Sequence, residues 1–518
     1  MLGVVGAGTM GAGIAQVAAL GGFETYLHDP FPEALERGLR LARSGFAKGA
    51  ERGRWSAEEA TFAEQRLRSA PELEDLSSCD LVIEAAPEDL ELKRDLFARL
   101  SEICGADTLL ATNTSSLPVT AMASAAAEPE NVIGMHFFNP APLMSLLELV
   151  AGSESSRAAI AAGREVGERM GKRVILAADG PGFLANRCAR PFGMEALKLL
   201  REGIADHATI DRVVRMGGGF RMGPFELSDL VGIDVGFEVS KSFYEQSFHE
   251  RRWQPSPIQA RMVQAGRYGR KVGRGYYDYA AGPHRPDDPA PPSKAGSGRV
   301  AIVGEGPLAE ELRALATSAG FELDTVGGDG LELVVRAEVT SPPEPVELGD
   351  APVCVLCAAG SLAELDHAGG AVGFHALPPL GECGLVELTR GALSSDGAAE
   401  HAERFFGSIG KHVEWVGDAP GLVLGRIVCQ LVNEACFALS EGVGSAPDID
   451  TALKLGFNHP RGPLEWADVI GLDRVLVTID ALHEERHEER YRAAPLLRRM
   501  VAEGRLGRAF GAGFFSYD

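Results

Sequence analysis

The sequence predicts a duplicated α/β protein, in which a Rossmann domain and an all-α helical domain are followed by a degenerate Rossmann copy and a second helical domain. Three observations predict this class: a glycine-rich strand–helix–strand opening, an internal repeat at a constant offset, and a second opening of the same kind before the second repeat. A chain of 518 residues is also too long for one hydrophobic core, so several domains are expected.

The first opening lies in residues 1–30, which read as strand, turn, helix and strand: LGVVG, GTMGAGIAQVAALGG and FETYLHD. Glycines of a GxGxxG motif allow a tight turn, close approach of a pyrophosphate and close helix–strand packing. An acid ending the second strand binds the ribose 2′-hydroxyl and favours NAD over NADP. The cofactor residues predicted here are Gly6, Gly8, Thr9, Met10, Gly11 and Asp29.

The internal repeat relates residues 179–279 to residues 418–518. Asp179 matches Asp418, and Gly182 matches Gly421. Apolar residues recur in each copy at spacings of three and four, which indicates helices. Gly203 is therefore expected to end a helix in the first copy, as Gly442 does in the second.

The second opening lies in residues 299–326: RVAIVG, EGPLAEELRALATSAG and FELDTV. Gly304 and Gly306 remain, but Ala309 replaces the third glycine and Gly327 stands where Asp29 stands in the first copy. Because the ribose acid is missing, no dinucleotide is predicted to bind there. The predicted parts are an NAD-binding Rossmann domain (1–178), a helical domain (179–280), a Pro-, Gly- and Ala-rich linker (281–298), a degenerate Rossmann domain (299–417) and a second helical domain (418–518).

Composition excludes several classes of partner. The net charge is -23 without a basic cluster, which argues against nucleic acid and anionic membranes. No signal peptide or bilayer-spanning run is recognisable. The eight cysteines are scattered; Cys354 and Cys357 form a CxxC, but within VCVLCAAG, which reads as a buried strand. No metal is expected, and a reduced cytoplasmic location fits best.

A histidine and a glutamate mark the predicted chemistry. His136 precedes Glu148 by one loop between two apolar segments, so two strand ends can bring them side by side. Oxidation of an alcohol requires a base that removes the hydroxyl proton, and histidine titrates near neutrality. A carboxylate on the other ring nitrogen fixes the tautomer. The alternative is a satisfied core histidine beside an exposed glutamate.

The first 280 residues resemble the short-chain L-3-hydroxyacyl-CoA dehydrogenase family through GAGTMGAGIAQ, ATNTSSLPVT, GMHFFNPAPLMSLLELV, DGPGFLANR and MGPFELSDLVGID. Both halves together resemble the long bacterial form found in phenylacetate and related acyl-CoA catabolism. The resemblance implies NAD-dependent oxidation of an (S)-3-hydroxyacyl-CoA thioester to the 3-oxoacyl-CoA, as in fatty-acid β-oxidation.

The resemblance also implies roles for residues. His136 is the base and Glu148 its partner, while Ser115 and Asn186 are further catalytic residues that also bind substrate. Asn186 could equally cap a helix. The remaining contacts implied are Glu88, Lys93, Asn139 and Lys271 for the dinucleotide and Lys48 for CoA. Glu88 and Lys93 could instead form an exposed helical pair, and Lys48 could simply be solvated.

The second half keeps His375 and Glu387 at the same spacing, but Gly425 replaces Asn186 and HALPP replaces HFFNP. This second site is therefore expected to be a relic. Because single-copy relatives dimerise through the helical domain, the second helical copy is expected to cover the first as an internal pseudo-dimer. Assembly of whole chains into a homo-oligomer stays open.

Other functions remain as alternatives. A dehydrogenase of a free hydroxyacid or sugar acid, of the gulonate dehydrogenase and lambda-crystallin type, is the nearest. A non-catalytic nucleotide-binding or scaffold protein would suit the second half alone. No crotonase-like domain precedes residue 1, so no hydratase activity is expected. The acyl chain is open between hydroxybutyryl and hydroxyadipyl; Arg187, Arg190 and Arg221 are the cations available for a dicarboxyl substrate.

Overall fold

The computed structural model describes residues 1–280, 282–328, 330–339, 351–366 and 368–517; residue 281, at the start of the predicted linker, and residue 518 lie outside these ranges. The chain forms two compact units. One is Met1–Arg187 with Glu441–Phe457, and the other is Cys188–Ser440 with Asn458–Asp518. Within the described ranges, every helix is too short or too polar to span a lipid bilayer.

The first unit is built on a sheet with the strand order β3-β2-β1-β4-β5-β6-β7-β8. All neighbouring strands are parallel except β6 and β7, which are antiparallel. This is the doubly wound order expected of a Rossmann domain, with two strands added at one edge. The strands are β1 (Leu2–Val5), β2 (Thr25–His28), β3 (Leu67–Ala70), β4 (Leu81–Glu84), β5 (Leu109–Thr112), β6 (Val132–Phe137), β7 (Leu146–Ala151) and β8 (Arg173–Ala178).

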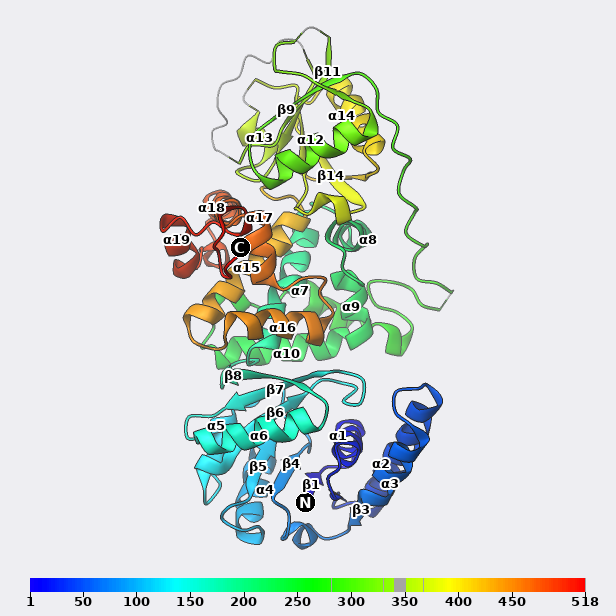
Figure 1. Ribbon diagram of the computed structural model, residues 1–518, viewed down its shortest axis with the longest axis vertical. Coiled ribbons are helices and arrows are strands. Elements are labelled where there is room, and N and C mark those ends of the chain that lie inside the picture. The colour runs from blue at the N-terminus through cyan, green and yellow to red at the C-terminus, as the bar shows by residue number, and fades with distance from the viewer. Residues whose placement is uncertain (281, 329, 340–350, 367, 518) are drawn as a thin grey trace. The chain divides into compact units, whose positions relative to one another are not determined.

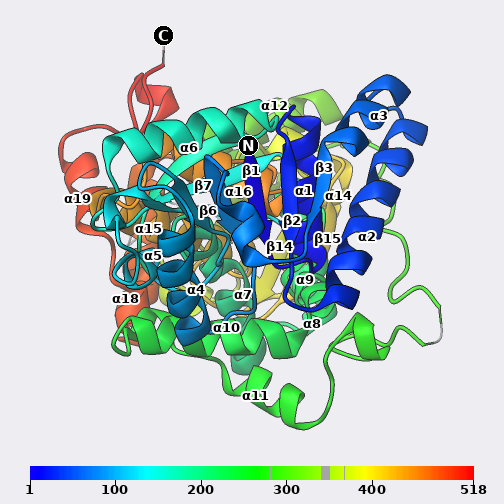
Figure 2. The same ribbon diagram turned by 90° about the horizontal axis from the view of Figure 1, so that it is seen from below.

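Helices cover this sheet because their apolar faces need burial. The α1 helix packs against α2 and α3, which lie side by side (Figures 1 and 2). Residues such as Ile14, Leu39 and Phe46 join the strand side chains in one core. The helices are α1 (Thr9–Leu20), α2 (Pro32–Glu51), α3 (Ala57–Arg66), α4 (Leu90–Ile103), α5 (Val119–Ala123) and α6 (Arg157–Arg169).

The second unit contains a sheet of the order β10-β9-β11-β12-β13-β14-β15, again with a single antiparallel pair, β13 with β14. Among the described residues, the pattern repeats that of the first sheet without a counterpart of its edge strand β3, and it confirms the predicted second Rossmann fold. Cys354 in β12 and Cys357 directly after it are both buried, as expected around a core strand. The strands are β9 (Arg299–Val303), β10 (Glu322–Leu323), β11 (Leu331–Arg336), β12 (Val353–Leu356), β13 (Val372–His375), β14 (Leu385–Arg390) and β15 (His412–Val416); its helices are α12 (Pro307–Ala319), α13 (Leu362–Leu365) and α14 (Asp396–Ser408).

The two repeated segments are helical, as predicted. Gly203 and Gly442 follow the ends of α7 and α15 with positive φ angles of 71° and 72°, a conformation that glycine adopts without strain. The first copy contains α7 (Ala185–Glu202), α8 (His207–Arg212), the π-helical turn η3 (Val213–Gly217), α9 (Pro224–Val231), α10 (Ile233–Gln246), α11 (Pro257–Gln264) and η5 (Arg270–Val272). The second contains α15 (Leu424–Ser440), α16 (Ala446–Phe457), α17 (Pro463–Ile470), α18 (Leu472–Arg486), α19 (Pro495–Ala502) and η8 (Arg508–Phe510).

Each helical copy sends one segment to the sheet of the other half. In the first unit α16 packs on β7 and β8, and the Ala178 N–H donates to the Val443 carbonyl at 2.8 Å. In the second unit η3 packs on β14, and the Gly417 N–H donates to the Ile204 carbonyl at 2.7 Å. The repeat offset relates these two hydrogen bonds, so the exchange is reciprocal.

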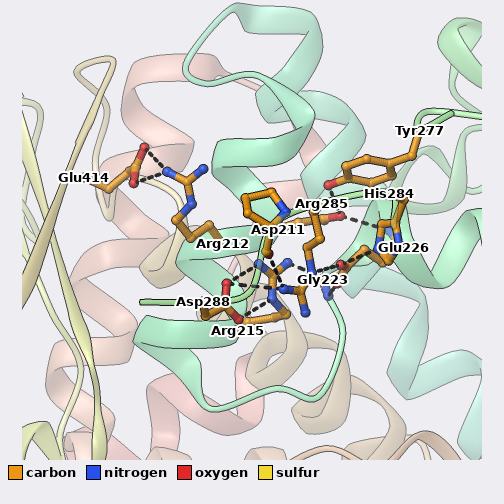
Figure 3. A network of polar contacts seen from close by, with 11 residues as sticks. Asp211, Arg212, Arg215, Gly223, Glu226, Tyr277, His284, Arg285, Asp288 and Glu414 are labelled. Carbon is orange, nitrogen blue, oxygen red and sulfur yellow. Dashed lines mark hydrogen bonds and ion pairs between the residues drawn. The ribbon is translucent and has the colours of Figure 1, made fainter. Parts of the chain in front are cut away.

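The linker is held by an ion-pair network in the second unit (Figure 3). Arg215 lies between Glu226 and Asp288, at 3.1 Å and 2.7 Å. Glu226 also accepts from His284 at 2.9 Å and from Arg285 at 2.5 Å. The linker therefore packs against the first helical copy through charged groups that satisfy one another.

Candidate functional site

The glycine-rich turn between β1 and α1 has the geometry that a dinucleotide needs. Gly6 has a φ of 97°, and a Cβ there would lie 2.6 Å from the Ala85 carbonyl oxygen. A Cβ on Gly11 would lie 1.7 Å from the Gly6 oxygen, so only glycine lets the helix pack this closely. Around Gly8 no atom lies within 4 Å of such a Cβ. The open backbone at the helix N-terminus, where Thr9 and Met10 begin α1, fits a pyrophosphate.

Asp29 follows directly after β2, at the position predicted for the ribose acid. Its Oδ2 accepts from the Ala7 N–H at 2.9 Å, and its Oδ1 accepts from the Phe31 N–H at 3.0 Å. These bonds orient the carboxylate beside the turn. Each carboxylate oxygen can accept more than one hydrogen bond, so capacity for a ribose hydroxyl remains.

His136 and Glu148 face each other across the antiparallel pair of strands. They are register partners in β6 and β7, and the distance from His136 Nδ1 to Glu148 Oε2 is 2.8 Å. Both residues are buried. A carboxylate accepts, so Nδ1 donates, and the lone pair of the imidazole is then on Nε2. The alternative with an exposed glutamate is wrong, because Glu148 is fully buried.

The other oxygen of Glu148 is held by the start of α7. Oε1 accepts from the Leu184 N–H at 2.7 Å and the Ala185 N–H at 2.9 Å. Phe138 and Phe183 lie beside the imidazole of His136, with ring centroids 4.7 Å and 5.9 Å from its own. The carboxylate and the ring are thus fixed in one orientation.

Ser115, Glu88 and Lys93 meet at the carboxyl ends of β4 and β5. Glu88 accepts from the Ser115 N–H at 2.9 Å and lies 3.4 Å from Lys93 Nζ. The reading of Glu88 and Lys93 as an exposed helical pair is wrong for Lys93, which is 1% exposed. Lys93 donates to the buried Glu84 at 2.6 Å. Sequence reasoning missed Glu84, although an acid ending the apolar strand LVIE is an unusual residue there.

The structure places the other predicted residues on separate elements. Asn186 is the second residue of α7, within its first turn, and follows the N–H groups that hold Glu148. Lys48 on α2 and Asn139 after β6 are both exposed. Lys271 belongs to the second unit, where it donates to Asp234 at 2.6 Å.

Two of the arginines considered for a dicarboxyl substrate already have partners. Arg187 forms an ion pair with Glu441 at 2.7 Å. Arg190 donates to Ser240 and lies 4.2 Å from the centre of the Phe243 ring in the second unit, and burial lowers its pKa to about 10. Arg221 is exposed in the same unit.

The corresponding pair in the second half is separated and shielded. His375 Nδ1 lies 3.9 Å from Glu387, too far for a hydrogen bond, and in the described part of the chain this nitrogen has no hydrogen-bond partner. A Cβ on Gly425 would lie 2.4 Å from the His375 ring, so the imidazole occupies the space beside the position that Asn186 holds in the first copy. The geometry supports the interpretation of a relic.

The second glycine turn is also covered. Arg474 donates to the Glu305 carbonyl at 2.6 Å, and its Nη2 would lie 2.0 Å from a Cβ on Gly306. At the sequence offset that aligns Gly304 with Gly6, Gly327 stands where Asp29 stands, and in the structure β10 has already ended at Leu323. Arg474 therefore lies over the second glycine turn, and the ribose acid is absent at the matching position of the sequence. Across the described residues, no cluster of histidine, cysteine and carboxylate side chains is arranged for a metal ion.

Comparison with known families gives matches to both kinds of domain. Residues 1–180 match the model of the 3-hydroxyacyl-CoA dehydrogenase NAD binding domain. Residues 182–279 and 421–517 both match the model of the 3-hydroxyacyl-CoA dehydrogenase C-terminal domain.

Individual relatives match one half or the whole chain. A 3-hydroxyadipyl-CoA dehydrogenase of Escherichia coli (strain K12) is 37% identical over 96% of both chains. A probable 3-hydroxybutyryl-CoA dehydrogenase of Deinococcus radiodurans is 40% identical over 54% of this chain and 99% of its own. The crystal structure of a 3-hydroxybutyryl-CoA dehydrogenase from Escherichia coli K12 matches with a TM-score of 0.83 and 34% identity, covering 97% of this chain and 98% of that one. The chain belongs to the 3-hydroxyacyl-CoA dehydrogenase family.

Proposed function

We propose that the protein oxidises (S)-3-hydroxyacyl-CoA thioesters to 3-oxoacyl-CoA with NAD. The observation that carries this proposal is the His136–Glu148 pair in the same compact unit as the glycine turn. NAD, when bound, supplies the hydride acceptor, and the turn of Gly6, Gly8 and Gly11 with Asp29 is the place to hold it.

His136 Nε2 takes the proton of the 3-hydroxyl group as the carbinol carbon is oxidised, and it returns that proton in the reverse direction. Glu148 holds the tautomer, and its negative charge stabilises the imidazolium that forms. Two backbone N–H groups bind its other oxygen and fix the carboxylate in place. Ser115 bonds the substrate oxygen, and Asn186 donates to the thioester carbonyl. Lys48 contributes charge for the phosphates of CoA.

The remaining assignments are proposals of the same kind. Glu88 and Asn139 contact the dinucleotide, and Lys93 acts from the buried side, with its Nζ 3.4 Å from Glu88. The family resemblance assigns Lys271 to the dinucleotide as well. The two reciprocal hydrogen bonds, Ala178 to Val443 and Gly417 to Ile204, support an internal pseudo-dimer. The domain bounds of this proposal are those that the sequence predicts. The eight cysteines are all free, which supports a cytoplasmic location.

The test is the reverse reaction. Purified protein is mixed with NADH and acetoacetyl-CoA, and the loss of reduced nicotinamide is followed. His136→Gln is expected to lower kcat about 10²–10⁴-fold, the usual contribution of a general base. His375→Gln is the matched control, and its rate should equal that of the wild type.

Absence of turnover while NADH still binds would contradict a short-chain CoA substrate. The same assay with 3-oxoadipyl-CoA then tests the dicarboxyl class that the name of the Escherichia coli relative carries. Activity confined to free hydroxyacids or sugar acids would replace the proposal by its nearest alternative.

A further inference from the structure

A segment of the second helical copy lies in the same compact unit as the candidate catalytic residues. Glu441–Phe457 belongs to the unit of residues 1–187, although α15 just before it belongs to the other. Glu441 pairs with Arg187, the neighbour of Asn186, at 2.7 Å. The second half therefore reaches the surroundings of the first site.

Phe457, the last residue of α16, ends this segment next to the catalytic ring. Its ring packs edge-on against Phe138, with centroids 6.2 Å apart and an interplanar angle of 80°. Phe138 in turn lies on the imidazole of His136, at 4.7 Å. These distances are those of favourable aromatic contacts, so the two phenylalanine rings form an apolar wall beside the imidazole of His136.

Gly456 makes this packing feasible. A Cβ there would lie 3.0 Å from Leu146 Cδ2 and 3.1 Å from Phe138 Cε1, so any larger residue would push on the ring. The preceding residues of α16 lie on β7 and β8. The packing of α16 on the sheet thus holds Phe457 in place beside Phe138.

The aromatic pair is present on one side of the duplication only. At the repeat offset, Phe138 corresponds to Leu377 and Phe457 to Gly218. The half with the separated His375 and Glu387 therefore has neither ring. If the fold itself required these two rings for packing, both copies would be expected to keep them, so the rings are better explained by the first site.

We propose that Phe457 is a specificity-determining residue of the first site, where it backs Phe138 and limits the length of acyl chain that fits. The proposal rests on the proposed function. A substrate whose 3-oxygen bonds Nε2 of His136 must lie beside the ring of Phe138, and an apolar wall suits its alkyl part rather than its CoA part. Removing Phe457 leaves space into which Phe138 can move, so longer chains are accommodated.

The experiment compares acetoacetyl-CoA with 3-oxooctanoyl-CoA in the full-length protein. Phe457→Ala is expected to raise the ratio of kcat/KM for the longer over the shorter substrate about tenfold or more, because even one methylene changes discrimination in a hydrophobic pocket by about that factor. Phe457→Leu, which keeps most of the volume, should shift the ratio in the same direction by less. A merely structural role would lower both substrates alike and leave the ratio unchanged.

Phe510→Ala is the matched control, because Phe510 is a phenylalanine of the same helical copy that is 63% exposed. An unchanged ratio in Phe457→Ala, with a melting temperature like that of the wild type, would overturn the inference. If that variant does not fold, the ratio in Phe457→Leu decides in the same way. Wild-type turnover of acetoacetyl-CoA, measured alongside, reports on the proposed function separately.

Discussion

At the scale of single residues, the two histidine–glutamate pairs show how surroundings decide function. His136 and Glu148 are joined by a hydrogen bond of 2.8 Å, whereas His375 and Glu387 are 3.9 Å apart. Burial lowers the pKa of His375 to about 4 and raises the pKa of Glu387 to about 8. Between these values both groups of the second pair are neutral in the folded protein, so this pair lacks the charged carboxylate that would stabilise an imidazolium.

Glu387 gives a prediction for the pH dependence of stability. Its pKa rises from the usual 4.5 to about 8 on folding, because burial disfavours the carboxylate. The stability associated with the bound proton is complete below pH 4.5 and is lost as the pH rises through 8. Glu387→Gln, which can still accept the Val423 N–H, should therefore raise the melting temperature relative to the wild type more at pH 8 than at pH 5.

Glu400→Gln serves as the comparison, since Glu400 is an exposed glutamate of the same half. Its effect on the melting temperature should be the same at both pH values. If Glu387→Gln gave equal shifts at pH 5 and pH 8, the carboxyl would not be protonated in the folded protein.

Residues were predictable where a motif fixes their position in the sheet. His136 and Glu148 end up opposite each other because the connection between their strands is short and the strands pair in register. The burial of Lys93 was not predictable, because it depends on Glu84 and Glu88, which come from a different strand end and loop.

At the scale of elements, one buried arginine joins the two central helices of the second unit. Arg426 on α15 is fully buried; it donates to Glu195 of α7 at 2.9 Å and 2.5 Å, and to Glu202 at 2.8 Å. The Tyr491 hydroxyl also lies 2.9 Å from it. Helix periodicity predicts both helices, but it does not show which charged residues pair between them.

Arg426→Met is expected to destabilise the protein by about 3–5 kcal/mol, because it leaves Glu195 buried without its counter-charge. The midpoint of urea unfolding measures the change. Arg498→Met is the matched control, since Arg498 pairs with Asp480 at the surface, where ion pairs contribute about 0–1 kcal/mol. Equal losses in both variants would show that the buried network adds no more than a surface pair.

At the scale of the whole molecule, the sequence predicts four successive domains with a linker, and the repeat makes that prediction strong. The structure forms two compact units, and the second helical copy is divided between them, with α16 in one unit and α15 in the other. Such an exchange depends on which sheet a helix finds in three dimensions. The repeat offset is the same whether or not the copies exchange segments, so sequence alone does not reveal it.

The duplication also determines how many cofactors one chain binds. Titration of the full-length protein with NADH by isothermal calorimetry should give one site per chain, because Arg474 covers the second glycine turn and the ribose acid is missing there.

Asp29→Ala should weaken this binding about tenfold or more, the loss expected for a hydrogen bond to a charged group. Asp324→Ala, which removes the acid just after β10, is the matched control and should bind as the wild type does. Two sites per chain, or a loss with Asp324→Ala equal to that with Asp29→Ala, would mean that the second Rossmann copy still holds a dinucleotide; a single site lost only with Asp29 would leave that copy with a structural role, as the support on which η3 of the first helical copy packs.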